Sequence, residues 1–285
     1  MRNLRRGAQG WVDAFHPLPT LAVTVFATAY ALAAQNGLSL SGFGWAVSVG
    51  LAILAGQLCV GWSNDAFDAP RDLRAQRDDK PISSGRISVR VVAASACCAA
   101  AAAVLLSWRL PHDAGFLHLI AVLSAISYNA GLKSTVLSPL PYLVSFGLLP
   151  AIASLAVTGS VPTTSTIGAA ALLGAGAHFA NTVGDTEADA LTGVRGLPQR
   201  IGPARSLTVM AVLIALAAAW LLVGVVGAGG VGVIREVTAG VLLLGGVLLG
   251  LAGALGRSLV LRGDAAFRLT LLAVSFVVAG VLVTA

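Results

Sequence analysis

Two short segments of this sequence repeat one arrangement of side chains that bind metal ions through oxygen. In each segment an asparagine is followed by aspartates four and eight residues later: Asn64, Asp68 and Asp72 in the first set, and Asn181, Asp185 and Asp189 in the second. In an α-helix this spacing stacks the three side chains on one face. Each set is therefore predicted to direct one amide and two carboxylates towards the same point.

Carboxylates stacked in this way repel one another, so a positive partner must neutralise them. Oxygen ligands without histidine or cysteine suit Mg²⁺, which proteins usually hold with one or two carboxylates and the phosphate oxygens of a substrate. Two facing sets would clamp a diphosphate through shared magnesium ions. The alternative interpretation is that both sets are acidic helix ends paired with Arg71, Arg74 and Arg195. Pro70 lies within the first set and is predicted to kink or end the helix there.

Basic side chains follow the first acidic set, and one lysine stands alone between two later apolar segments. Arg77, Lys80 and Arg86 come soon after the first set, and Lys133 comes shortly after Tyr128. A departing diphosphate accumulates negative charge, which positioned cations stabilise. The alternative for Lys133 and Arg86 is that they anchor helix ends at the membrane surface.

The composition indicates that lipid surrounds the elements that carry these residues. Hydrophobic residues make up 57% of the chain and charged residues only 11%, whereas soluble domains are typically about 25% charged. A spanning helix needs about 20 apolar residues. Runs without Asp, Glu, Lys or Arg predict nine spans, at residues 18–35, 44–63, 91–107, 114–131, 136–158, 164–183, 207–226, 236–256 and 268–284. We therefore expect an all-α integral membrane protein with nine transmembrane helices in one bundle.

The position of the two acidic sets predicts an internal repeat. They lie four spans apart, which suggests two four-helix repeats followed by a ninth helix, with the site at the interface between the repeats. No linker divides the chain. Residues 1–285 are therefore interpreted as a single transmembrane domain with motif loops at 64–90 and 184–205.

The basic residues place the acidic sets on the cytoplasmic side of the membrane. With a cytoplasmic N-terminus, every Lys and Arg except Arg109 and Arg235 falls on that side, as the positive-inside rule requires. The formal charge of +6 then reflects loops that face anionic lipid, and no soluble basic domain exists to bind nucleic acid. Three cysteines are too few for a disulfide framework. We expect a multi-pass protein of the cell membrane, and no obligate protein partner is evident.

Several segments of the sequence resemble the UbiA superfamily of intramembrane prenyltransferases. The resemblance covers nearly the whole chain. It rests on Asn64-Asp65-x-x-Asp68-x-x-x-Asp72, on Asp185-x-x-x-Asp189, on the stretches from Lys80 to Ser88 and from Tyr128 to Lys133, and on Leu197-Pro198 followed by Arg200-Ile201-Gly202.

The resemblance implies a central cavity that opens to the cytoplasmic side and laterally to lipid. It implies Mg²⁺-dependent ionisation of a prenyl diphosphate, followed by attack of a lipophilic or aromatic acceptor on the carbocation. By the resemblance, Mg²⁺ would be held by Asn64, Asp65, Asp68, Asp72, Asp185 and Asp189. The diphosphate would contact Asn64, Arg77, Lys80, Lys133 and Asn181. The catalytic residues would be Asp68, Asp185, Asp189, Lys133 and Tyr128, with Tyr128 stabilising the cation or positioning the diphosphate.

One position departs from the pattern of this family. Where many members have Arg-Pro near the start of the first span, this chain has His16-Pro17, which weakens an assignment to acidic aromatic acceptors. His16 is interpreted as an interface residue or a general base, and His178 as a packing residue or a further site residue. Two other functions stay open. A terpene cyclase would ionise the same diphosphate, although an aromatic content of 6% disfavours it. A secondary transporter would place its ionisable residues near the membrane midplane.

Overall fold

The computed structural model describes residues 2–35, 37 and 39–228, together with 240, 244–247, 279–280 and 282. The main elements of this part are all helices: α1 (Arg2–Asp13), α2 (Pro17–Ala33), α3 (Leu40–Arg74), α4 (Val89–Ser107), α5 (His112–Ala130), the short 3₁₀ helix η1 (Leu132–Ser134), α6 (Leu140–Thr158), α7 (Thr164–Thr192), α8 (Leu197–Ile201) and α9 (Pro203–Ala228). Each of the first seven expected spans coincides with one of these helices. The expected spans at 236–256 and 268–284 lie almost entirely outside the described residues, so the total of nine stays a prediction.

Several of the helices can cross a membrane. By length and hydropathy, α3, α4, α6 and the first part of α9 qualify as single spans among the described residues. The pair α1 and α2 qualifies together, with a bend of 52° between the two helices. The sequence-based interpretation of a multi-pass membrane protein is therefore supported by the helices themselves.

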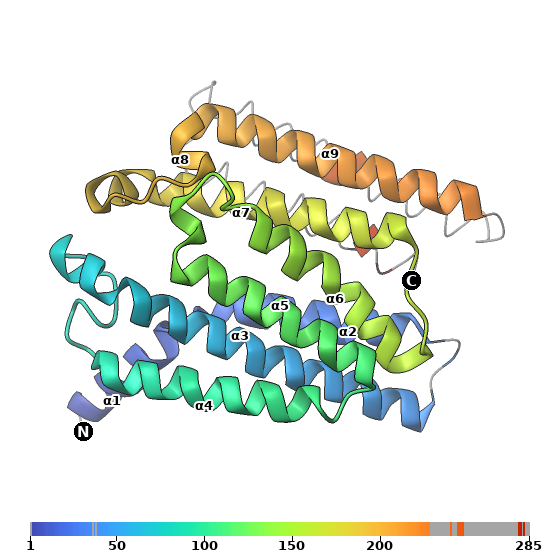
Figure 1. Cartoon of the computed structure of the whole chain (residues 1–285), viewed down its shortest axis with the longest axis horizontal. Coiled ribbons are helices and arrows are strands. Elements are labelled where there is room, and N and C mark those ends of the chain that lie inside the picture. The colour runs from blue at the N-terminus through green and yellow to red at the C-terminus, as the bar shows by residue number, and fades with distance from the viewer. Residues whose placement is uncertain are drawn as a thin grey trace.

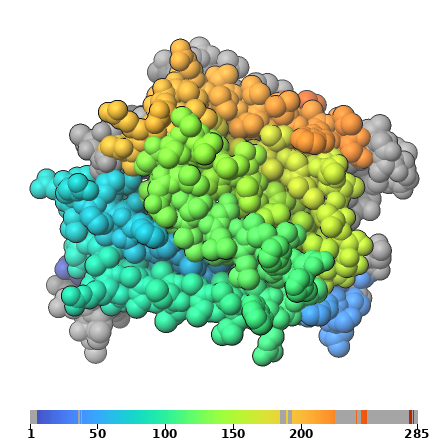
Figure 2. Space-filling model, viewed as in Figure 1, coloured from blue at the N-terminus to red at the C-terminus, as the bar shows by residue number. Residues whose placement is uncertain are grey.

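The long helices lie side by side along the long direction of the molecule (Figure 1). α3 packs against α2, α4 and α5, and α7 packs against α6 and α9. α5 and α6 pack against each other and join these two groups of helices across the middle of the face shown in Figure 2. The largest fully buried side chains of the main core include Ile152, Met210 and Ile214.

Short polar side chains and glycines set the helix boundaries. The Ser39 hydroxyl accepts a hydrogen bond from the Gly42 N–H at 3.0 Å and begins α3. The Thr163 hydroxyl accepts from the Thr166 N–H at 3.3 Å and begins α7. These contacts satisfy N–H groups that have no partner inside the helix. Gly193 ends α7 with φ of 78°, a left-handed conformation that favours glycine.

Both acidic sets lie on helices that are longer than the sequence predicted. α3 has 35 residues and is therefore about 52 Å long, which exceeds the roughly 30 Å hydrocarbon core of a bilayer. Of the two outcomes predicted for Pro70, an end of the helix is wrong, because α3 continues to Arg74, whereas a kink at this position stays a prediction. The proline removes one N–H from the hydrogen-bond ladder, and the remaining contacts of the helix hold its last turn. α7 continues through the second set in the same way, so the segments expected as loops at 64–90 and 184–205 begin as helix.

Candidate active site

Three carboxylates near the end of α3 are buried. Asp65, Asp68 and Asp72 are 2%, 6% and 3% exposed, respectively. Spacings of three and four residues place them on one face of the helix. Asn64, which the sequence placed on the face of Asp68 and Asp72, is partly buried. Because an unpaired buried charge is strongly unfavourable, positive groups must lie close to this face.

Two cations hold the carboxylate of Asp68. The Nζ of Lys133 donates to Asp68 Oδ1, and Nη2 of Arg71 donates to Asp68 Oδ2 at 3.0 Å. The Nε of Arg71 also lies 3.7 Å from Oδ1 of Asp72. Burial lowers the pKa of the Lys133 ammonium, and the neighbouring Asp68 opposes that shift. The isolated lysine of the sequence thus joins the first acidic set across 65 positions of the chain.

Asp65 has a different environment from the other two carboxylates. Its Oδ1 lies 3.1 Å from Nε2 of His16 and 3.2 Å from Nζ of Lys80. Its Oδ2 is buried and has no hydrogen-bond partner within the described part of the chain. His16 separates α1 from α2 and has φ of 55°, a value that is uncommon for a residue other than glycine. The contact between His16 and Asp65 was not predicted, because no spacing rule connects positions so far apart.

Arg77 binds an aspartate in the same loop. Its Nε and Nη2 donate to the two carboxylate oxygens of Asp79 at 2.8 and 2.7 Å. These hydrogen bonds hold the pKa of Asp79 below its usual value. Lys80, by contrast, faces the buried site through Asp65. Contact of either side chain with a diphosphate stays a prediction.

The second acidic set is held by a residue that the sequence analysis missed. Asp189 is buried, and its Oδ2 accepts a hydrogen bond from Nε2 of Gln199 at 2.8 Å. Gln199 belongs to α8, the short helix that follows α7. Asn181 is exposed, and its side chain lies close to that of Tyr142. Asp185 lies on the backbone of α7 between Asn181 and Asp189, but its side chain is outside the described residues.

The segment that follows Asp189 packs directly against the segment that carries Lys133. A Cβ atom on Gly196 would lie 2.5 Å from the carbonyl oxygen of Lys133, so the two backbones meet closely. The N–H of Leu197 donates to the Ser138 hydroxyl at 3.0 Å. Because the side chain of Lys133 reaches Asp68, η1 connects the end of α3 with the segment between α7 and α8.

Replacing Gly196 with alanine is expected to destabilise this junction. The added methyl group would meet a backbone oxygen that cannot rotate away, and overpacking of this kind costs about 1–3 kcal/mol. We expect a lower unfolding temperature in detergent and reduced turnover. Gly44→Ala is the matched control, because a Cβ at Gly44 meets open space. Equal unfolding temperatures for the Gly196→Ala protein and the wild type would contradict the close contact.

Aromatic rings lie beside the junction. The centroid of the His178 ring is 5.5 Å from that of Tyr128 and 4.9 Å from that of Tyr142. Nε2 of His178 lies 3.0 Å from Oγ of Ser138, the hydroxyl that also binds Leu197. The packing interpretation of His178 therefore fits its surroundings. Aromatic faces attract cations, so this cluster suits the neighbourhood of a carbocation.

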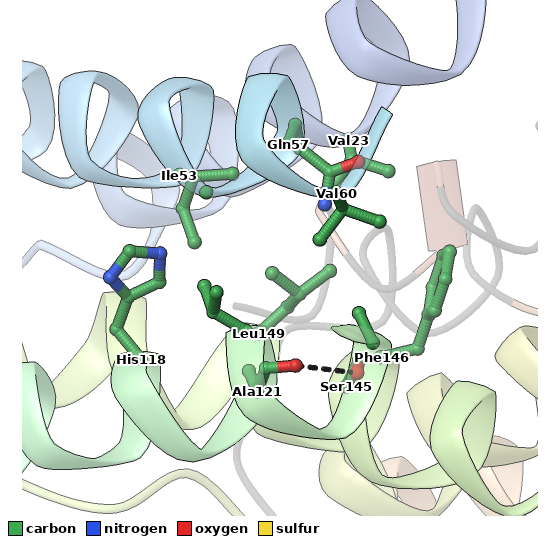
Figure 3. A pocket seen from close by; sticks show the side chains of 12 residues that line it. Val23, Ile53, Gln57, Val60, His118, Ala121, Ser145, Phe146 and Leu149 are labelled. Carbon is green, nitrogen blue, oxygen red and sulfur yellow. Dashed lines mark hydrogen bonds between the residues drawn. The ribbon is translucent and has the colours of Figure 1, made fainter. Parts of the chain in front are cut away.

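A cavity lies between α2, α3, α5 and α6 (Figure 3). Most of its wall is apolar and includes Val60, Phe146 and Leu149. Val60 lies about one helical turn before Asn64, so the cavity approaches the first acidic set. Phe146 also stacks on Tyr142 with ring centroids 6.0 Å apart, which places the aromatic cluster beside the cavity. The openings expected on the cytoplasmic side and towards lipid stay predictions.

The donor groups suit a hard divalent cation. Among the described residues no three His, Cys, Asp or Glu side chains converge as a metal site, and the side chain of Asp185 is not among them. The buried carboxylates of α3 nevertheless offer oxygen atoms, and Oδ2 of Asp65 lacks a partner in this part of the chain. Carboxylate oxygens match the ligands of Mg²⁺, and here lysine and arginine side chains neutralise them.

The comparison with protein families decides the identity of this fold. The model of the UbiA prenyltransferase family matches residues 21–272. This chain belongs to the UbiA prenyltransferase family. The resemblance inferred from the sequence motifs is thereby confirmed. None of the curated proteins matches the chain in a sequence search.

Solved structures of UbiA homologues share the fold. An apo UbiA homologue from Aeropyrum pernix K1 has a TM-score of 0.71 at 20% identity, over 93% of this chain and 97% of that one. A UbiA homologue from Archaeoglobus fulgidus, bound to DMAPP and Mg²⁺, has a TM-score of 0.68 at 17% identity, over 95% and 98%. A structure from a study of digeranylgeranylglyceryl phosphate synthase in membranes has a TM-score of 0.67 at 16% identity, over 99% and 98%.

Asn129 is a further residue of this UbiA family member that the sequence analysis did not select. Its Nδ2 donates to the carbonyl of Val60 at 2.9 Å and to Oγ of Ser63 at 3.0 Å. These contacts tie the end of α5 to the turn of α3 that precedes the acidic set. Asn129 follows Tyr128 in the sequence, but consecutive helix positions do not share a face, so no spacing rule selected it.

Proposed function

We propose that this protein transfers a prenyl group from a prenyl diphosphate to a lipophilic or aromatic acceptor within the membrane, with Mg²⁺ as cofactor. One residue carries the proposal. Lys133 binds Asp68 through its side chain and meets Gly196, beyond Asp189, through its backbone. The diphosphate would lie between the two acidic sets, next to Lys133. The Archaeoglobus fulgidus homologue bound to DMAPP and Mg²⁺ supports this choice of ligands.

The residues divide into metal ligands and diphosphate ligands. Mg²⁺ would be held by oxygen atoms of Asn64, Asp65, Asp68, Asp72, Asp185 and Asp189. When bound, it would stabilise the negative charge that develops on the departing diphosphate. Lys133 and Arg71, which pair with Asp68, would donate hydrogen bonds to phosphate oxygens once the carboxylate binds metal. Further donors to the diphosphate would come from Lys80, Arg77 and Asn181.

The reaction breaks one bond and forms another. The bond between the first prenyl carbon and the diphosphate oxygen breaks, and its electron pair leaves with the diphosphate. A nucleophilic atom of the acceptor then bonds to that carbon, and the acceptor loses a proton. Tyr128 would lie near the allylic cation and stabilise it through its ring. The apolar wall of the cavity, with Val60 and Leu149, would hold the prenyl chain because hydrocarbon is expelled from water.

Release of diphosphate is expected to require Mg²⁺. Purified protein incubated with labelled geranyl diphosphate should release diphosphate with Mg²⁺, lose that activity in EDTA and recover it when Mg²⁺ is added in excess. The reason is that the buried carboxylates cannot bind an anionic diphosphate without a bridging cation. Release that continues unchanged in EDTA would refute the metal role.

The products of the same assay distinguish the alternatives. A prenylated acceptor identifies a transferase, a cyclised hydrocarbon identifies a terpene cyclase, and uptake into vesicles without diphosphate release identifies a transporter. The acidic residues lie near the end of a helix that exceeds the bilayer core in length. This position supports an enzyme at one membrane face, which we take as the cytoplasmic face from the distribution of Lys and Arg.

A further inference from the structure

Three polar side chains line the cavity without a part in the proposed reaction, and one of them, Ser145, donates its hydroxyl proton to the Ala121 carbonyl at 2.9 Å. The other two are Gln57 and His118. Gln57 extends towards the cavity from α3, and His118 forms part of the wall from α5 (Figure 3). No hydrogen bond joins the amide of Gln57 to any residue that the structure describes. Buried polar groups are normally paired with protein atoms or ordered water. His118 is buried and Gln57 is partly buried, so both can present hydrogen-bonding atoms to the cavity.

The hydrogen bonds of Ser107 determine the tautomer of His118. The Ser107 hydroxyl donates its single proton to the carbonyl of Ala103 at 2.6 Å. It must therefore accept the hydrogen bond from Nδ1 of His118 at 2.7 Å. His118 is 1% exposed, and a charged imidazolium is unfavourable in such surroundings. The ring is thus neutral, with its proton on Nδ1 and only a lone pair on Nε2.

The lone pair of His118 faces the cavity wall. A Cβ atom on Gly56 would lie 2.9 Å from Nε2 of His118, and Gly56 itself lines the cavity. The absence of a side chain at Gly56 lets this nitrogen approach the backbone of α3 closely. Nε2 has no hydrogen-bond partner among the described residues, so it offers an acceptor on the cavity wall at Gly56, the residue before Gln57 in α3.

Both polar groups lie far from the acidic set. Gln57 is roughly 16 Å from Asp68 along the axis of α3. His118 lies further still from the site, since it stands near the start of α5 and Lys133 follows the end of that helix. A prenyl chain that extends from the diphosphate into the cavity would pass Val60 before it reaches Gln57 and His118.

We propose that Gln57 and His118 limit the length of the prenyl chain that the cavity accepts. The inference rests on the proposed function. A hydrocarbon that passes Gln57 displaces water from the amide and from Nε2 without replacing its hydrogen bonds. Each unpaired group then disfavours the longer substrate by about tenfold, which is about 1.4 kcal/mol. The preferred substrates are short prenyl diphosphates whose chains end before these two residues.

Competing substrates of different length test this proposal. The wild type is expected to have a higher kcat/KM with geranyl than with geranylgeranyl diphosphate. Gln57→Leu and His118→Leu should each reduce this ratio by about tenfold. Ser48→Ala is the matched control, because it removes a hydroxyl of α3 that donates to the Gly44 carbonyl at 2.8 Å and is not part of the cavity wall in the part of the chain that the structure describes. That variant should keep the wild-type ratio, and turnover of geranyl diphosphate shows that each variant is folded.

The outcomes separate this proposal from the proposed function. An unchanged ratio in both leucine variants, with geranyl diphosphate still consumed, would overturn the role of the polar pair. A wild type that releases diphosphate from neither substrate would overturn the proposed function and this inference with it. Nitrogen NMR of histidine-labelled protein provides a test without turnover. It should show a neutral, Nδ1-protonated ring whose signals disappear in His118→Leu, and an Nε2-protonated ring would contradict the argument.

Discussion

Replacing Asp68 with asparagine is expected to lower turnover roughly a thousandfold, a loss of about 4 kcal/mol of transition-state stabilisation. The amide keeps the shape of the side chain but removes the charge that pairs with Lys133 and Arg71. It also removes a carboxylate that would bind Mg²⁺. The measurement is Mg²⁺-dependent release of diphosphate at saturating substrate, with circular dichroism to confirm the helical content.

The control for this change is Asp113→Asn. Asp113 is 78% exposed at the start of α5, where its carboxylate lies 3.1 Å from Nδ1 of the neighbouring His112. Loss of its charge should leave turnover unchanged. If Asp68→Asn retained activity within about twofold of the wild type, the assignment of the first acidic set as the metal site would fail.

Replacing Lys133 with methionine is expected to lower kcat roughly a hundredfold. Methionine retains an unbranched, apolar stem but has no ammonium to stabilise the departing diphosphate. The buried Asp68 then retains Arg71 as its one close cation among the described residues. Single-turnover measurements separate this effect on the chemical step from an effect on substrate binding. Arg109→Met, which removes an exposed cation from the turn between α4 and α5, should have no effect.

A double mutant tests the contact between the two residues. Because Nζ of Lys133 binds Asp68 directly, the two substitutions should not be additive. Asp68→Asn combined with Lys133→Met is expected to lose less activity than the product of the separate losses. Multiplication of the two effects would show that the residues act independently, contrary to the shared cluster.

Local sequence was sufficient to locate the helices and the two acidic sets. The apolar runs predicted a helix at each of the first seven expected spans, because partition into lipid depends on the length and hydrophobicity of a single segment. The spacing of Asp68 and Asp72 predicted a shared face, because the helical repeat is a local property. Pro70 misled the prediction of the boundary, since its single missing N–H did not outweigh the packing of the whole helix.

Tertiary structure alone decided which partners these residues have. Lys133 binds Asp68, and Gln199 binds Asp189. Asp65 contacts both His16 and Lys80. None of these pairs follows from a helical repeat, because its members are brought together by the packing of different helices and by the loops between them. The same holds for the tautomer of His118, which depends on a hydroxyl of the preceding helix. Periodicity assigns a side chain to a face, whereas the neighbouring helix determines what that face contacts.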